Sequence, residues 1–77
     1  MAPGVTVYST PLCIPCEELK RHLTTHGIAF TLVDLLIDEE AADMLEEAGI
    51  ITAPAIAIDG ELIEGFDVER VNALLGL

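Results

Sequence analysis

The chain has 77 residues, 52% of them hydrophobic, and carries fourteen acidic and three basic side chains, a net charge of −11. That length allows one domain with a small core, predicted over residues 1–77. The charge argues against nucleic acid and an anionic membrane as partners, since both bind through basic side chains, and leaves solubility or attraction of a basic partner protein as its role.

The first half of the chain predicts a strand, a helix and a second strand. Residues 5–8 are a short apolar run with β-branched side chains, which is typical of a buried strand. A helix is predicted from about residue 13 to residue 26, with Leu19 and Leu23 on one face. Residues 28–33 predict the second strand.

The second half begins with another predicted helix, which three acidic residues at 38–40 open. Their charges suit the positive N-terminal end of a helix. Its apolar positions are Ala41, Met44, Leu45 and Ala48. Two strands, 55–58 and 61–63, then flank Asp59-Gly60, a strong hairpin signal.

A last helix is predicted after Asp67, which fits an N-cap. Its expected buried positions are Val68, Val71, Leu74 and Leu75. The element order is therefore β-α-β-α-β-β-α, an α/β fold. A right-handed crossover makes the first two strands parallel and the hairpin adds an antiparallel pair, so we expect a four-stranded mixed sheet with helices on both faces.

The two cysteines, Cys13 and Cys16, lie where a predicted strand turns into a helix, and they are separated by Ile14 and Pro15. A C-x-x-C in this context is typical of a thioredoxin-like redox motif. Free N–H groups at a helix start stabilise a thiolate and can lower a cysteine pKa to about 3.5–7.5. We expect Cys13 to attack a disulfide and Cys16, one turn further in and more buried, to resolve the mixed disulfide.

Charged side chains follow the cysteine pair along the predicted helix. Glu17 and Glu18 should oppose thiolate formation, whereas Lys20 and Arg21, one turn further, should favour it. The sequence therefore predicts no direction for their combined effect on the first cysteine.

A zinc site is the alternative interpretation, because Cys13, Cys16, His22 and His26 form C-x2-C-x5-H-x3-H. Such a site needs a chain reversal between its two pairs of ligands. One continuous predicted helix carries all four residues, with Cys16 and His22 about 9 Å apart along its axis. No metal site is predicted, and the two histidines are interpreted as a partly exposed helix face.

No basic and apolar segment precedes Val5, so a signal peptide is not expected. The apolar runs also fall far short of the roughly 20 residues that a membrane span requires. We expect a cytoplasmic location, a reducing compartment where cysteine pairs are more often catalytic than structural.

Three motifs, in order and at similar spacing, resemble the glutaredoxin family over the whole chain. They are the segment YSTPLCIPC at 8–16, Thr52-Ala53-Pro54 before a predicted strand, and Gly65-Phe66-Asp67. The resemblance implies a thioredoxin fold and an enzyme, a small oxidoreductase that reduces protein disulfides or mixed disulfides. It also implies a cis peptide bond before Pro54, opposite the cysteines.

The resemblance further implies which residues bind substrate. They are Tyr8, Ile14, Pro15, Ala53, Pro54, Gly65, Phe66 and Asp67. The backbone of Ala53 would pair with an extended substrate, and Asp67 would hold the γ-glutamyl end of glutathione. Purely structural roles are also possible: Tyr8 packs the first helix, Gly65 is a turn glycine, and Asp67 is only a helix cap.

Departures from the family pattern leave the electron donor open. Proline before the second cysteine is similar to the Cys-Gly-Pro-Cys of thioredoxin, and the basic residue often found near Thr10 is missing. Glu64 replaces the first glycine of a glycine pair, which adds negative charge beside an anionic ligand. Gly65-Phe66 resembles the Ser-Gly-Phe of NrdH-type redoxins, although Ile63 stands where they have tryptophan.

Several functions therefore remain open. We expect a monomer without a tightly bound cofactor that acts on disulfide-containing proteins, with glutathione or another small thiol as co-substrate. If the protein is instead an NrdH-type redoxin, thioredoxin reductase reduces it and it donates electrons to ribonucleotide reductase. A binding role is also open, either for an iron–sulfur cluster bridged between two copies through Cys13 or for an interaction module with an idle cysteine pair.

Overall fold

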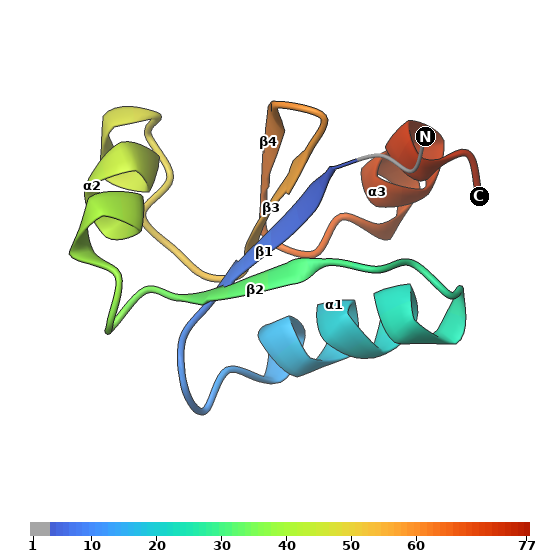
Figure 1. Cartoon of the computed structure of the whole chain (residues 1–77), viewed down its shortest axis with the longest axis horizontal. Helices are drawn as coiled ribbons and strands as arrows, with labels where there is room; N and C mark the ends of the chain where they lie inside the picture. The colour runs from blue at the N-terminus through green and yellow to red at the C-terminus, as the bar shows by residue number, and fades with distance from the viewer. Residues whose placement is uncertain (1–3) are drawn as a thin grey trace.

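The computed structural model describes residues 4–77 and has the predicted order of elements (Figure 1). The elements are β1 (Val5–Ser9), α1 (Ile14–Thr25), β2 (Thr31–Asp34), α2 (Glu39–Glu47), β3 (Ala55–Ile58), β4 (Glu61–Glu64) and α3 (Val68–Leu75). Within the described part of the chain, none of these helices is long and apolar enough to cross a membrane.

The four strands form one mixed sheet in the order β2-β1-β3-β4. β1 and β2 are parallel, as the predicted crossover requires, and β3 is antiparallel to both of its neighbours. The predicted hairpin is present, with Asp59 and Gly60 at φ angles of 49° and 89° in its turn. The predicted fold class is therefore confirmed.

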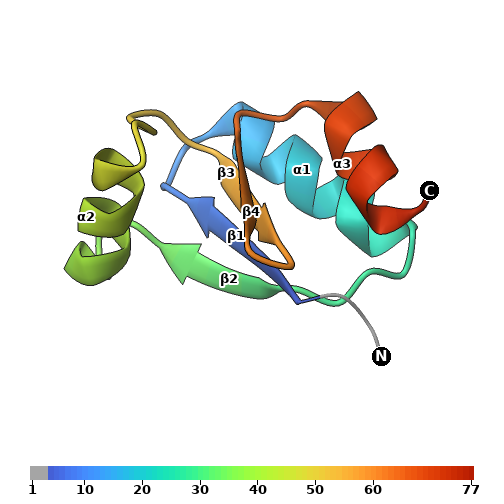
Figure 2. The ribbon, with the colours of Figure 1, turned by 90° about the horizontal axis from the view of Figure 1, so that it is seen from above.

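The core lies between one face of this sheet and the helices α1 and α3, which lie together on that side (Figure 2). Alternate residues of β1 supply Val5 and Val7 because successive strand side chains point to opposite faces. Leu19 and Leu23, one helical turn apart, supply the face of α1. The whole buried cluster is Val5, Val7, Leu19, Leu23, Ile56, Ile58, Ile63 and Val71.

The second face of the sheet is covered less completely than expected. Thr6, Tyr8 and Ala57 point to this face and are only half-buried. The helix α2 lies toward the C-terminal ends of β1 and β2 rather than over the middle of the sheet (Figures 1 and 2). Helix cover on this side is therefore concentrated near the ends of these two strands.

The second strand begins three residues later than predicted, at Thr31 instead of residue 28. The N–H of Ile28 donates to the carbonyl of Leu23 at 2.9 Å, which closes the end of α1 after a left-handed Gly27. A helix-closing bond of this kind uses the donor that a sheet ladder would need. Ile28 therefore packs against the core without belonging to the strand.

Several apolar positions predicted to face the core are exposed instead. Leu45 of α2 and Val71 of α3 are buried as predicted, and Leu75 is partly buried. The exposed ones are Met44, Ala48, Val68 and Leu74. Helices of nine and eight residues make only about two turns, so each buries one residue fully.

We expect Leu23→Ala to lower the free energy of unfolding by about 2–5 kcal/mol, because it opens a cavity in the core cluster. The matched control is Leu36→Ala, where the side chain is 71% exposed, and we expect a change within about 0.5 kcal/mol. Urea unfolding followed by circular dichroism measures both. Equal costs for the two variants would contradict the assignment of the core.

Candidate redox site

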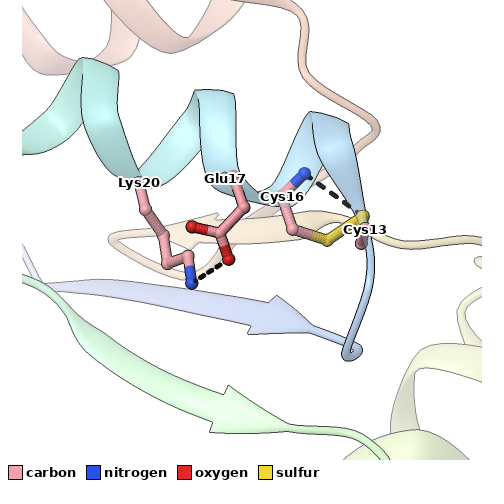
Figure 3. Close-up of a disulfide and its surroundings, with 4 residues drawn as sticks. All are labelled: Cys13, Cys16, Glu17 and Lys20. Atoms are coloured by element: carbon pink, nitrogen blue, oxygen red, sulfur yellow. Dashed lines mark hydrogen bonds and ion pairs between the residues drawn. A yellow bond between two sulfur atoms is a disulfide. The ribbon is translucent and has the colours of Figure 1, made fainter.

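The two cysteines lie at the start of α1, where the first one is the N-cap of the helix. Cys13 has the extended backbone of an N-cap (φ −109°, ψ 108°), and its Sγ accepts a hydrogen bond from the backbone N–H of Cys16 at 3.2 Å (Figure 3). Pro15 lies in the first turn, where its missing N–H has no helical partner to lose. The predicted position of Cys13 at the helix start is confirmed.

A disulfide joins Cys13 to Cys16, so the structure represents the oxidised protein (Figure 3). The two sulfurs differ in their surroundings, because Cys16 is 1% exposed whereas Cys13 is partly exposed. An incoming sulfur can therefore reach Cys13 but not Cys16. This asymmetry is the geometry that a pair of attacking and resolving cysteines needs.

The sulfur of Cys13 occupies a position that carboxylates occupy in the other two helices. Asp38 caps α2 by accepting from Ala41 N–H at 3.0 Å, and Asp67 caps α3 by accepting from Arg70 N–H at 3.2 Å. An N-cap side chain faces the free N–H groups and the positive end of the helix, which favour an anion. A thiolate on Cys13 would gain the same stabilisation.

The charges beside the site partly cancel. Lys20 Nζ donates to Glu17 Oε1 at 2.7 Å, an exposed ion pair on the next turn of α1 (Figure 3). Glu18 and Arg21 line the same surface depression as Cys13. Each acid that was predicted to oppose a thiolate therefore has a base near it, and the helix start remains the feature that distinguishes Cys13.

Two apolar side chains flank the accessible sulfur on one side of this depression. Leu12 is fully exposed and has a left-handed backbone with φ 58°, while Ile14 is 74% exposed. Both line the depression that contains Cys13. Leu12 is not among the site residues predicted from the sequence, and the only signal for it was its place directly before the first cysteine.

The peptide bond between Ala53 and Pro54 is cis, as predicted. Ala55, the next residue, pairs with Tyr8 of β1, so Pro54 lies by the end of β1 from which the chain continues to Cys13. A groove of about 360 Å³ runs from the cis-proline loop to α2 at this edge. Its lining is Thr10, Leu35, Ala42, Leu45, Glu46, Ile50, Ile51, Thr52 and Ala53.

The segment Gly65-Phe66-Asp67 begins with a glycine bonded to the cis-proline. Gly65 has φ 75°, which makes it a turn glycine, and its N–H donates to the carbonyl of Pro54 at 2.8 Å. The Phe66 ring packs against the core, with its centroid 5.6 Å from that of His22. Each of these residues thus has a structural role, and their contacts with substrate stay predictions.

Tyr8 does not pack against the first helix, so that interpretation is wrong. Val5 and Val7 contact the core that contains Leu19 and Leu23, and Tyr8 alternates to the opposite face of the sheet. There its partners across the sheet are Val33 and Ala55. A substrate contact by Tyr8 stays a prediction.

Several known proteins are similar to this chain in sequence. The sequence profile of the glutaredoxin family, described as Glutaredoxin, matches residues 5–63. A glutaredoxin-like 8.6 kDa protein in the rubredoxin operon of Clostridium pasteurianum is 32% identical over 75 residues, covering 92% of this chain and 96% of that protein. The glutaredoxin-like protein NrdH of Lactococcus lactis subsp. cremoris is 36% identical over 62 residues, covering 80% and 86%.

Among solved structures, the NrdH-redoxin of Escherichia coli superposes with a TM-score of 0.86 at 26% identity and covers 91% of this chain and 92% of its own. That protein is described as glutaredoxin-like with a thioredoxin-like activity profile. The similarity extends over nearly all of both chains, and the predicted thioredoxin fold is confirmed.

We expect iodoacetamide to alkylate Cys13 of the reduced protein much faster than Cys16, because Cys16 is buried and lies behind the first sulfur. Peptide mass spectrometry after short exposures at pH 7 measures the ratio. The rate at Cys16 in denatured protein is the control for intrinsic reactivity. Faster labelling of Cys16 in the folded protein would exclude Cys13 as the attacking sulfur.

Proposed function

The chain belongs to the glutaredoxin family and is a thiol–disulfide oxidoreductase, and we propose that it is a cytoplasmic dithiol reductant of protein disulfides whose own disulfide is reduced by thioredoxin reductase. We take residues 1–77 as its single domain. The observation that carries the proposal is the asymmetric pair at the helix start, where Cys13 is accessible and Cys16 is buried behind it.

The reaction follows from this pair in two exchanges. The Cys13 thiolate attacks one sulfur of a target disulfide, so a mixed disulfide forms and the other target sulfur leaves as a thiolate. The Cys16 thiolate then attacks Cys13 Sγ, which releases the second target sulfur and forms the Cys13–Cys16 bond. The target gains two electrons and, with two protons from solvent, becomes a dithiol.

Substrate would dock between the apolar rim and the cis-proline loop. Leu12 and Ile14 flank the accessible sulfur, and both side chains can contact a polypeptide. The backbone of Ala53, just before the cis bond of Pro54, can pair with an extended segment as an added strand. These contacts suit a protein substrate, because they use backbone and apolar surface rather than fixed charge.

Two observations favour thioredoxin reductase over glutathione as the donor. Proline stands directly before the second cysteine, and the similar proteins include two named NrdH, one with a thioredoxin-like activity profile. Glutathione carries two carboxylates and one ammonium group, so it is anionic like the chain itself, whose net charge is −11. Glutathione stays the second candidate because Gly65, two residues before Asp67, donates to the carbonyl of the cis-proline.

Replacing either cysteine by serine should give two different results. Cys13→Ser should abolish reduction of insulin disulfides, since no accessible sulfur remains. Cys16→Ser should instead accumulate a stable mixed disulfide with the target, because nothing resolves it, and mass spectrometry should detect the adduct. Full insulin reduction by the Cys13→Ser protein would contradict the assignment of the attacking sulfur.

The donor can be identified by offering two recycling systems side by side. We expect NADPH with thioredoxin reductase to reduce the oxidised protein at least about tenfold faster than NADPH with glutathione and glutathione reductase. Consumption of NADPH at 340 nm measures both rates, and each system without the protein is its control. Faster recycling by glutathione would overturn the proposed donor while leaving the reductase chemistry intact.

A further inference from the structure

The loop that carries the cis-proline is held by the end of β4. One oxygen of Glu64, Oε2, accepts from the backbone N–H of Ile51 at 3.3 Å and from the hydroxyl of Thr52 at 3.2 Å. The next residue, Gly65, donates its N–H to Pro54. Residues 51–54, the docking loop, are therefore fixed at three points by two consecutive residues.

Glu64 also lies at the end of the sheet where β1 finishes and the chain continues to the cysteines. Val33, Tyr8, Ala55 and Glu64 form one row across the four strands, because each pairs with the next. The chain leaves β1 one residue after Tyr8 and reaches Cys13 four residues later. With strands about 4.8 Å apart, Glu64 lies roughly 10 Å across the sheet from β1.

From these contacts we propose that Glu64 is a positioning and selectivity residue of the redox site. Its carboxylate oxygen fixes the docking loop, and its negative charge slows thiols with anionic substituents relative to neutral and cationic ones. The inference rests on the proposed function, since it concerns which thiols and polypeptides reach Cys13. It adds a residue that holds the loop but does not itself contact the reacting sulfurs.

The two roles make different demands on the side chain, so substitutions separate them. Glu64→Gln keeps an acceptor oxygen for Ile51 and Thr52 but removes the charge. Glu64→Met removes the acceptor oxygen and the charge but keeps a side chain of similar length. Glu64→Lys removes the acceptor oxygen and reverses the charge. Glu61→Gln, at the opposite end of β4, changes the net charge from −11 to −10 as Glu64→Gln does and is the matched control.

The charge role is tested by reducing the oxidised protein with small thiols of different charge. In the first step a small thiolate attacks Cys13 Sγ, and Cys16 leaves as a thiolate. In the second step another small thiolate attacks the sulfur that the first one contributed to the mixed disulfide, which releases a small disulfide and the Cys13 thiolate. The probes are mercaptoethanesulfonate and glutathione (anionic), mercaptoethanol (neutral) and cysteamine (cationic). Comparing one thiol across variants cancels its intrinsic reactivity.

At about 10 mM ionic strength, where the Debye length is about 30 Å, Glu64→Gln should raise the rate constant with both anionic thiols about two- to fourfold. Coulomb's law gives about this size for unit charges roughly 10 Å apart in water, and Glu64 lies about that far from β1, the strand that leads to Cys13. Mercaptoethanol, whose attacking thiolate carries a single negative charge, should gain less than the anionic thiols. Cysteamine, whose ammonium group balances its thiolate, should change least, and about 1 M salt should remove the differences. Glu64→Lys should enlarge them.

The positioning role is tested with insulin reduction driven by dithiothreitol. Glu64→Gln should keep kcat/KM close to that of the unchanged protein, whereas Glu64→Met should lower it about threefold or more, because the docking loop loses two hydrogen bonds. Thermal unfolding of each variant checks that the fold persists.

Identical charge dependence in Glu64→Gln and the unchanged protein would overturn the selectivity role, as would an equal effect of Glu61→Gln. A kcat/KM for insulin reduction by Glu64→Met equal to that of the unchanged protein would overturn the positioning role. Failure of the unchanged protein to reduce insulin would instead reject the proposed function, and the thiol series would remain measurable in that case.

Discussion

The hydrogen bond from the backbone N–H of Cys16 to the sulfur of Cys13 is the interaction on which the site depends. A single contact caps α1, places the accessible sulfur at the positive end of the helix and brings the second cysteine within bonding distance. The same bond therefore serves the fold and the chemistry. A serine at this position could cap the helix as well, but it would lack the sulfur that forms a disulfide.

The parts of the site that depend on local sequence were predictable. The N-cap position of Cys13 follows from a cysteine pair at the junction of a strand and a helix, and the cap role of Asp67 follows from its place before an apolar helical pattern. The orientation of Tyr8 could also be predicted from the sequence, because Val5 and Val7 already define the core face of an alternating strand. The cis peptide bond before Pro54 was predicted from the family resemblance and not from these local rules.

Other features depend on contacts that a single sequence does not specify. Ile28 and Phe30 alternate like strand residues, yet the end of α1 takes the Ile28 N–H. The hydrogen bonds from Ile51 and Thr52 to Glu64 join positions thirteen and twelve residues apart, and they exist because a hairpin brings the end of β4 back to the cis-proline. Only the completed sheet creates such a contact.

The distribution of apolar and charged residues is compatible with the proposed action of so acidic a protein on other proteins. Two exposed apolar side chains, Leu12 and Ile14, flank the accessible sulfur, so contact with them buries hydrocarbon from water. The segment from residue 34 to residue 47 holds seven of the fourteen acids and no base, and it runs from the last residue of β2 to the end of α2. Under the proposed function, apolar contact and most of the negative charge thus come from separate segments of the chain, so a substitution in one of them would change how a partner protein binds and leave the cysteine chemistry the same.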